Sequence, residues 1–273
     1  MAIIDGKSLA ERIKTKVAKE IASFKGERPN LAIILASDRE DSKLYVSLKE
    51  KSAKTVGIDT NLYILDPEKT SQEEFLSVID FLNKDETIDG ILVQLPLPSK
   101  FDTDQIINAI DPEKDVDGFH PNHPEDVDSP VLGAADEIIK DLGFDAKGKV
   151  AAVVYNSEVF GQGAKAFFER LDASVVLVSP DDPKLPDKLF KSDIVLVAVG
   201  RPKFLGAECF NTEAVIIDVG ITKVDGKVVG DVDFDAVKDH VAYITPVPGG
   251  VGPMTIALLF RNTLAIYKRR HKN

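Results

Sequence analysis

The feature that most constrains this chain is the regular alternation of short apolar runs with amphipathic stretches. Residues 194–199 (Ile-Val-Leu-Val-Ala-Val) and 91–93 (Ile-Leu-Val) are apolar at every position. Such runs are typical of strands in a parallel sheet that helices cover on both faces. The stretches between them have helical spacing and short connections. The pattern therefore predicts a doubly wound α/β architecture.

The expected elements fall into two groups along the chain. Strands are expected at residues 31–36, 61–65, 90–95, 150–155, 174–178, 194–199, 214–219 and 241–244. Helices are expected at residues 7–23, 42–56, 71–83, 103–110, 134–142, 163–171 and 253–268. Residues 111–132, rich in Pro, Asp and His, interrupt the alternation and predict an extended loop at a domain junction.

Composition excludes several classes of function. A net charge of -11 opposes binding to nucleic-acid phosphates. No apolar run approaches the ~18 residues of a membrane span, and the N-terminus lacks the pattern of a signal peptide. The single Cys209 excludes an intrachain disulfide and predicts a cytoplasmic location. Basic residues at 268–272 are expected to complement the C-terminal end of the last helix.

Two residues on one predicted helix are candidates for chemistry. Tyr45 and Lys49 are four positions apart and therefore share a helix face. The ring suits stacking on a flat heterocycle, and a Lys partly withdrawn from water can transfer a proton. The alternative is a surface Lys that covers a half-buried Tyr.

Polar residues follow the apolar strand at 90–95 and open the next loop. Gln94 stands before two prolines, at a strand end where ligands bind in open α/β sheets, or else satisfies turn backbone groups. Asp115 and Asp117 precede Gly118 and could accept hydrogen bonds from a ligand, or else form Asx turns. Their spacing from His120 and His123 matches no strong metal motif, so no metal site is expected.

Two glycine-containing segments precede predicted helices. Residues 155–165 (Tyr-Asn-Ser-Glu-Val-Phe-Gly-Gln-Gly-Ala-Lys) lie where a dinucleotide phosphate would bind, but form a weak Gly-x-Gly-x-x-Gly match. Residues 245–255 (Thr-Pro-Val-Pro-Gly-Gly-Val-Gly-Pro-Met-Thr) fix an unusual backbone, with Pro253 suited to a first helical turn. So many constrained positions favour a functional loop.

Taken in this order, the segments resemble the bifunctional methylenetetrahydrofolate dehydrogenase/methenyltetrahydrofolate cyclohydrolase family. The similar motifs are Tyr45-Val46-Ser47-Leu48-Lys49, Gly90 to Pro98, Lys114 to Pro121 and Pro246 to Thr255, and they span essentially the whole chain. The resemblance implies two α/β domains around a cleft, with a final helix that returns to the first domain, in a homodimer.

The resemblance also implies roles for individual residues. Lys49 would transfer the proton of the cyclohydrolase step, and Tyr45 would stack on the folate rings. Gln94 would hydrogen-bond near Lys49, and Asp117 would hold the amino edge of the pterin. The folate-contacting loop would contain Pro248, Gly249 and Gly250, and the cofactor-binding residues would be Asn156, Ser157, Gly161, Ser179, Gly200 and Ile221.

The cofactor half departs from the family pattern. The leading Gly of the phosphate turn is Tyr155, the frequent Arg is Asn156 and the Pro is Gly163. NADP is the family default. Asp181 and Asp182, after the strand at 174–178, would repel a 2′-phosphate and accept from a ribose hydroxyl, which favours NAD.

The sequence therefore predicts a folate-binding catalytic domain at residues 1–120 plus 253–273 and a Rossmann-like NAD(P)-binding domain at 121–252. The predicted activity is oxidation of 5,10-methylene-tetrahydrofolate to the methenyl form, followed by hydrolysis to 10-formyl-tetrahydrofolate. The alternatives are a cyclohydrolase with a degenerate cofactor site, a catalytically silent folate-binding protein, and a nicotinamide dehydrogenase for another substrate. The intact set of Tyr45, Lys49, Gln94 and Asp117 argues against the last two.

Overall fold

The computed structural model describes residues 2–271, which form two compact units. The first unit combines the chain up to Ala10 with Val131–Thr255, and the second combines Glu11–Pro130 with the chain from Ile256 onward. Two helices, α1 (Gly6–Ala22) and α9 (Val251–Arg270), pass from one unit into the other. Within the described residues, no helix is long and apolar enough to cross a membrane.

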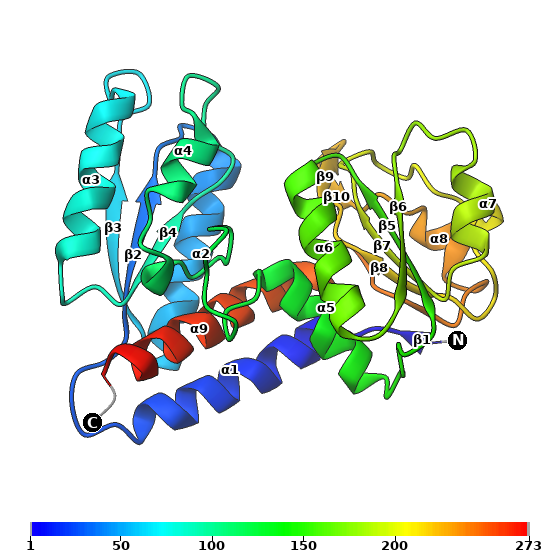
Figure 1. The fold of residues 1–273 in the computed structure, drawn as a ribbon, viewed down its shortest axis with the longest axis horizontal. Helices are drawn as coiled ribbons and strands as arrows, with labels where there is room; N and C mark the ends of the chain where they lie inside the picture. Colours follow the sequence, from blue (N-terminus) through cyan, green and yellow to red (C-terminus); the bar gives the residue numbers. More distant parts are fainter. Residues whose placement is uncertain (1, 272–273) are drawn as a thin grey trace. The chain divides into compact units, whose positions relative to one another are not determined.

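The second unit is built on a three-stranded parallel sheet in the order β3-β2-β4 (Figure 1). The strands are β2 (Asn30–Leu35), β3 (Asp59–Ile64) and β4 (Gly90–Val93), and the helices after them are α2 (Glu40–Val56), α3 (Gln72–Lys84) and α4 (Thr103–Asn108). Central β2 is buried from Leu31 onward, as its apolar sequence requires.

Alternate residues of β2 pack into two different cores. Leu31 and Ile33 pack with residues of α2 and α9, whereas Ala32 and Ile34 pack with residues of α3 and α4. A period of two along the strand places these pairs on opposite faces of the sheet. The helix α3 begins with a capping box, in which Ser71 and Glu74 satisfy each other's backbone N–H groups.

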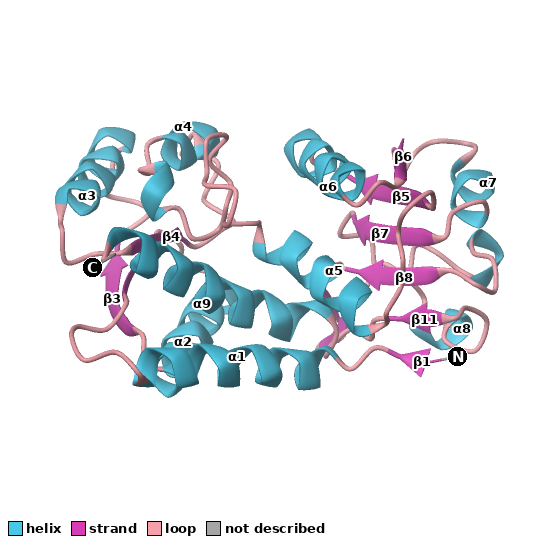
Figure 2. Ribbon diagram, turned by 60° about the horizontal axis from the view of Figure 1, so that its bottom comes forward, coloured by secondary structure: helices cyan, strands magenta, loops and turns pink. Residues whose placement is uncertain are grey.

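The first unit contains a six-stranded parallel sheet in the order β1-β11-β8-β7-β5-β6 (Figure 2). Its strands are β1 (Ala2–Ile3), β5 (Val150–Tyr155), β6 (Ser174–Val178), β7 (Ile194–Ala198), β8 (Val215–Asp218) and β11 (Tyr243–Ile244). Its helices are α5 (Pro130–Asp141), α6 (Glu158–Arg170), α7 (Leu185–Phe190) and α8 (Phe234–Val237). The predicted doubly wound α/β architecture is confirmed.

Several elements of the first unit differ from the sequence-based expectation. The N-terminal β1 pairs in parallel with β11, so the chain up to Ala10 belongs to the unit that contains the six-stranded sheet. A hairpin of β9 (Thr222–Val224) and β10 (Lys227–Val229) turns at Asp225 and Gly226, which both have positive φ. These strands and the short helices α7 and α8 carry too few residues for periodicity to reveal them.

The last helix returns to the three-stranded unit, as expected. Leu259, Phe260 and Leu264 of α9 lie in the same buried cluster as Leu31 and Ile33. The phenol of Tyr267 donates to the carbonyl of Glu27 at 2.6 Å. The final helix thus completes the core of that unit.

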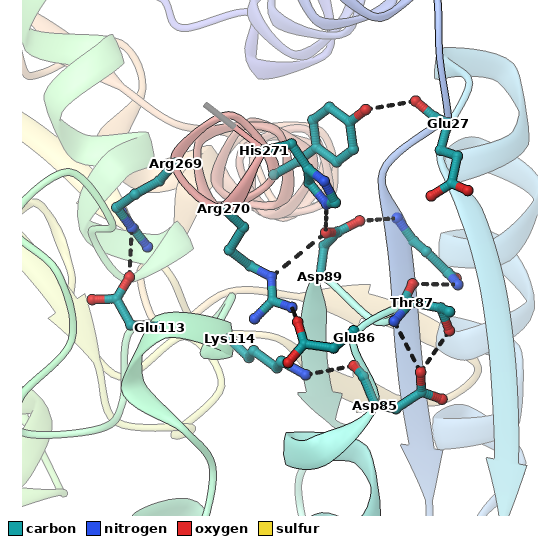
Figure 3. A network of polar contacts seen from close by, with 12 residues as sticks. Glu27, Asp85, Glu86, Thr87, Asp89, Glu113, Lys114, Arg269, Arg270 and His271 are labelled. Carbon is teal, nitrogen blue, oxygen red and sulfur yellow. Dashed lines mark hydrogen bonds and ion pairs between the residues drawn. The ribbon is translucent and has the colours of Figure 1, made fainter. Parts of the chain in front are cut away.

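Basic residues at the end of α9 form ion pairs with acidic residues of the same unit (Figure 3). Arg269 contacts Glu113 at 2.6 Å and also Asp126. Arg270 and His271 both contact the buried carboxylate of Asp89, at 3.7 and 2.7 Å. The basic residues that were expected to offset the dipole of the last helix therefore also hold its end against the rest of the unit. Lys272, the last residue of the predicted basic cluster, lies outside the described residues.

Candidate functional site

The helix α2 presents Tyr45 and Lys49 at successive turns. Val46, Ala53 and Val56 bury one side of this helix in the core, and Gly57 ends it with φ 87°. The ring of Tyr45 is 38% exposed, and Leu48 beside it is also exposed. Helix α2 thus offers an apolar surface, formed by Tyr45 and Leu48, next to the half-buried side chain of Lys49.

Lys49 is hydrogen-bonded to the residue that follows β4. Its Nζ donates to Oε1 of Gln94 at 2.9 Å, and Nε2 of Gln94 donates to the carbonyl of Leu95 at 2.6 Å. The second bond fixes the orientation of the amide, since only the NH₂ group can donate to a carbonyl. The structure therefore brings Lys49 and Gln94 together and aims an acceptor at the amine.

The loop after 3₁₀ helix η1 (Pro112–Lys114) holds two carboxylates in different roles. Asp115 is buried and accepts from the backbone N–H groups of Asp117, Gly118 and His120, at 3.0, 3.1 and 2.7 Å. It therefore performs the Asx-turn chemistry that was one of the two sequence-based readings. The carboxylate of Asp117 makes no hydrogen bond with any residue in 2–271, and remains free to accept from a ligand.

Burial and charge shift the pKa values of the central pair. Burial lowers the pKa of Lys49, and the negative charge of Asp117 opposes that shift. Burial also raises the pKa of Asp117 to about 6, with Lys49 opposing the shift and Asp115 adding to it. The pair thus combines an amine that is easier to deprotonate with a carboxylate that is easier to protonate, as expected of a proton-transfer site.

Helix α9 fixes the Asp117 loop through a residue that the sequence reasoning missed. Nδ2 of Asn262 donates to the carbonyls of Val116 and Asp128, at 2.9 and 2.8 Å. Asn262 is 1% exposed. The available signal was a polar amide between two apolar runs of the last predicted helix, at residues 256–260 and 264–266.

The glycine-rich loop lies in the other unit and is closely packed. Gly249 has φ 111°, a conformation that favours glycine. A Cβ on Gly6 would approach the carbonyl oxygen of Gly250 to 1.9 Å, so the start of α1 leaves room only for glycine there. Pro248 is exposed, whereas Gly249 and Gly250 are buried. The loop is therefore closely packed, and of the three predicted folate-contacting residues Pro248 is the one that is exposed.

The turn after β5 differs from the expectation at the glycines. Helix α6 begins at Glu158, so Gly161 lies inside the helix rather than in the turn. A Cβ on Gly161 would lie 2.7 Å from the Tyr155 ring, so this glycine makes room for the bulky residue that ends the strand. Asn156 and Ser157 do form the turn: Nδ2 of Asn156 donates to the Val199 carbonyl at 2.9 Å.

Ser157 is the N-cap of α6, at the carboxyl end of a central strand. Within the described residues, its hydroxyl makes no capping hydrogen bond. Free donors at a helix N-terminus are suited to a phosphate. Gly200, after β7, has φ 69°, and no atom lies within 4 Å of an added Cβ. These features leave open space and anion-binding groups where a dinucleotide would lie.

The charge argument for NAD requires a correction. Arg201 neutralises Asp181 with two contacts, of 2.8 and 3.2 Å, and Lys188 neutralises Asp182 with one of 2.6 Å. These cations hold the pKa of both carboxyls below the usual range. Repulsion of a 2′-phosphate is therefore much weaker than the sequence implied. The sequence did not reveal these cations, because Arg201 is distant in sequence and Lys188 belongs to a short helix that was not predicted.

Ser179 and Ile221, the remaining predicted cofactor residues, are exposed after β6 and β8. A Cβ on Gly252 would contact the Ile221 side chain at 3.7 Å, so Ile221 lies near the start of α9. Across residues 2–271, no cluster of His, Cys, Asp or Glu is arranged to hold a metal ion.

Known proteins resemble the whole chain. Residues 4–117 match the family model of the tetrahydrofolate dehydrogenase/cyclohydrolase catalytic domain, and residues 132–271 match that of its NAD(P)-binding domain. The bifunctional protein FolD of Sulfurihydrogenibium is 45% identical over 99% of both chains, and that of Nitratiruptor is 42% identical over 100% of both.

Solved structures agree with these matches. The bifunctional FolD enzyme of Campylobacter jejuni has a TM-score of 0.94 and 35% identity, with 99% of each chain covered. The FolD enzyme of Trypanosoma brucei, complexed with NADP cofactor and inhibitor, has a TM-score of 0.93 and 34% identity, covering 100% of this chain and 99% of that one.

Proposed function

The chain belongs to the tetrahydrofolate dehydrogenase/cyclohydrolase family, and from this premise we propose which of its residues perform the two reactions. The chain is a bifunctional enzyme: it oxidises 5,10-methylene-tetrahydrofolate to 5,10-methenyl-tetrahydrofolate with a nicotinamide cofactor, then hydrolyses the product to 10-formyl-tetrahydrofolate. This function is favoured over a cyclohydrolase that has lost hydride transfer, and over a silent folate-binding protein.

Lys49 is the proton-transfer group of the hydrolytic step. The contact between its Nζ and Oε1 of Gln94, at 2.9 Å, is the observation that carries this assignment. Gln94 cannot take up a proton from the amine, so it orients the amine and leaves the transfer to Lys49. The lowered pKa of Lys49 increases the fraction of neutral amine that can accept a proton from the attacking water.

Tyr45 and Asp117 bind the substrate. The half-exposed ring of Tyr45, one helical turn from Lys49, offers a flat apolar face for the folate ring system. The free carboxylate of Asp117 can accept hydrogen bonds from the amino edge of the pterin. Its negative charge also favours the cationic form of Lys49, so the two groups are electrostatically coupled. Pro248, Gly249 and Gly250 are assigned to the loop that contacts folate.

The cofactor is NADP, which the Trypanosoma brucei relative binds. When bound, it supplies the acceptor for the hydride that leaves the methylene carbon. The residues present fit this group: Ser157 and the N-terminus of α6 would hold the pyrophosphate, and Asn156 shapes the turn. Ser179, Gly200 and Ile221 border the same edge of the sheet, whereas Gly161 contributes by accommodating Tyr155.

The division of labour follows the two compact units. We assign proton transfer and the folate contacts of Tyr45 and Asp117 to the unit with Glu11–Pro130, and the cofactor-binding residues together with the loop at Pro248–Gly250 to the unit with Val131–Thr255. We further propose a homodimer, which the family resemblance supports, and a cytoplasmic location, which the single, unpaired Cys209 supports.

Two assays test the proposed function. Purified protein is mixed with 5,10-methylene-tetrahydrofolate and either NADP or NAD, and formation of reduced cofactor is followed. Separately supplied methenyl-tetrahydrofolate reports the hydrolytic step, with Lys49→Ala as the control. Reduction of NADP together with Lys49-dependent hydrolysis is expected. Hydrolysis without reduction of either cofactor would refute the dehydrogenase, and inactivity in both assays would refute the enzyme.

A further inference from the structure

An ion pair joins the loops that follow β6 and β7. Nη1 and Nη2 of Arg201 donate to the two carboxylate oxygens of Asp181, at 2.8 and 3.2 Å. The sheet order places β5 between β6 and β7 (Figure 2), so this pair spans the carboxyl end of β5. The turn that precedes α6 starts there. Both side chains stay exposed, at 44% for Arg201 and 75% for Asp181, and a ligand can reach them.

The backbone that carries Arg201 is held firmly. The N–H groups of Val199 and Gly200 donate to Oδ2 of Asp231, at 2.7 and 3.0 Å, and Asp231 is fully buried. The guanidinium also lies 5.3 Å from the centre of the Phe204 ring, within cation–π range. The fork of Arg201 is therefore positioned before any ligand arrives.

The cationic hydrogen-bond donors that are still unused at this edge include those of the Arg201 guanidinium. Arginine has five N–H donors, and Asp181 takes up two of them. The neighbouring Asp182 is already paired, because it accepts from Nζ of Lys188 at 2.6 Å and from the backbone N–H of Lys184 at 2.8 Å. An anion that approaches this edge therefore meets unused donors of Arg201.

We propose that Arg201 recognises the 2′-phosphate of NADP and that Asp181 limits the preference for NADP over NAD. In open dinucleotide-binding sheets, the adenosine ribose lies at the end of the second strand, which is β6 here. A 2′-phosphate there would share or replace Asp181 as the partner of the guanidinium. With NAD, Asp181 keeps Arg201 and can accept from the free ribose hydroxyl.

This inference rests on the proposed function, because it concerns the same cofactor site. It goes further by naming Arg201 and Asp181 as the pair that sets the choice between NADP and NAD. The two residues lie on different loops, 20 positions apart in sequence. The two residues have opposite expected effects. Removing Arg201 weakens NADP binding, whereas removing the charge of Asp181 strengthens it.

Titration calorimetry with the full-length protein tests the pair. Arg201→Gln is expected to weaken NADP binding about 10- to 100-fold, because a bidentate charge-assisted contact is lost, and to leave NAD binding within about twofold. Asp181→Asn is expected to strengthen NADP binding severalfold. The matched control is Lys203→Gln, which removes one positive charge from the same loop, where Lys203 pairs with Asp233 at 3.1 Å. The control should change neither affinity by more than about twofold.

The outcomes separate this inference from the proposed function. If the wild type binds both cofactors and Arg201→Gln weakens both equally, or neither, the inference is overturned and the dehydrogenase stands. An equal loss of NADP affinity in Lys203→Gln would likewise overturn it, since the effect would then come from net charge. If the wild type binds neither cofactor but hydrolyses methenyl-tetrahydrofolate, the dehydrogenase assignment fails, and the inference fails with it.

Discussion

The side-chain amide of Asn262 donates to the backbone carbonyl of Val116, 2.9 Å away, although 146 positions separate the two residues in sequence. A second bond, of 2.8 Å, reaches the carbonyl of Asp128. Asp117 directly follows Val116, so the final helix fixes the backbone that aims this carboxylate. The return of α9 to the three-stranded unit thus has a consequence for the site as well as for the core.

Asn262→Leu is expected to destabilise the protein and to impair folate chemistry. The substitution removes the amide that donates to the carbonyls of Val116 and Asp128, at a cost of about 1–3 kcal/mol for the buried carbonyl of Val116. Urea unfolding measures the stability, and hydrolysis of methenyl-tetrahydrofolate measures the site. Thr263→Val is the matched control, because Thr263 is equally buried but its hydroxyl donates to the Leu259 carbonyl within the same helix and, among the described residues, to no other element. Equal loss of activity in both variants would contradict a specific role for Asn262.

The sequence predicted those elements whose apolar pattern extends over several turns or residues and lies within the element itself. Strands β5 and β6 begin and end at the expected residues, because apolar runs flanked by turn residues mark them on both sides. By contrast, β1 has two residues, both exposed, and is a strand only because it pairs with β11. Such an element has no local signal, since its partner lies more than 200 positions away.

The candidate site shows the same division. Spacing alone placed Tyr45 and Lys49 on one helix face, but the contact between Lys49 and Gln94 depends on how α2 packs against the sheet. The charges at Asp181 and Asp182 were misjudged, because their partners Arg201 and Lys188 come from other elements. Ion pairs between distant segments are invisible until the fold brings them together.

Lys49→Met is expected to lower the hydrolysis of methenyl-tetrahydrofolate by about 100-fold or more, because a positioned proton-transfer group is lost. Folate binding should persist, since Tyr45 and Asp117 remain. In the wild type the rate should rise with pH and level off below the usual lysine range, because burial lowers the pKa of Lys49. Lys51→Met, on an exposed position of the same helix, is the control. Full activity in Lys49→Met would refute the assigned role.

Asp117→Asn is expected to change how stability depends on pH. The pKa of Asp117 is raised to about 6 in the folded protein, above the ordinary 3.8, so the folded state binds this proton more tightly than the unfolded state. The resulting stabilisation is fully present below about pH 4 and is lost as the pH rises through about 6. The unfolding free energy of the variant should therefore gain on the wild type between these values. A difference that stays constant with pH would contradict the shifted pKa.

Glu158→Gln is expected to strengthen cofactor binding about two- to fivefold. Glu158 lies in the first turn of α6, where its negative charge opposes the pyrophosphate that the helix N-terminus would attract. Burial raises the pKa of the Tyr155 phenol, and a hydrogen bond with Glu158 and the charge of Glu158 raise it further. The Glu158 carboxylate therefore lies beside the turn. Calorimetry with NADP measures the change. Glu169→Gln, near the other end of α6, is the control, and an equal gain there would point to net charge alone.

Asp89→Ala is expected to destabilise the protein far more than Glu20→Ala, although both carboxylates pair with the end of α9. The Asp89 side chain is 3% exposed and contacts both His271 and Arg270, so its removal leaves the Arg270 guanidinium and the His271 ring without their buried partner. It also accepts from the backbone N–H of Asn30 at 2.9 Å, which ties the final helix to the start of β2. We expect a loss of about 2–4 kcal/mol in urea unfolding.

The pair between Glu20 and Lys268 is instead exposed, at 43% and 53%, and should contribute less than about 1 kcal/mol. Salt distinguishes the two cases, because it screens exposed charges much more than buried ones. High salt should remove the small effect of Glu20→Ala and leave most of the effect of Asp89→Ala. If both effects vanished in high salt, the contacts of Asp89 would be surface pairs, and burial would not explain how α9 is held.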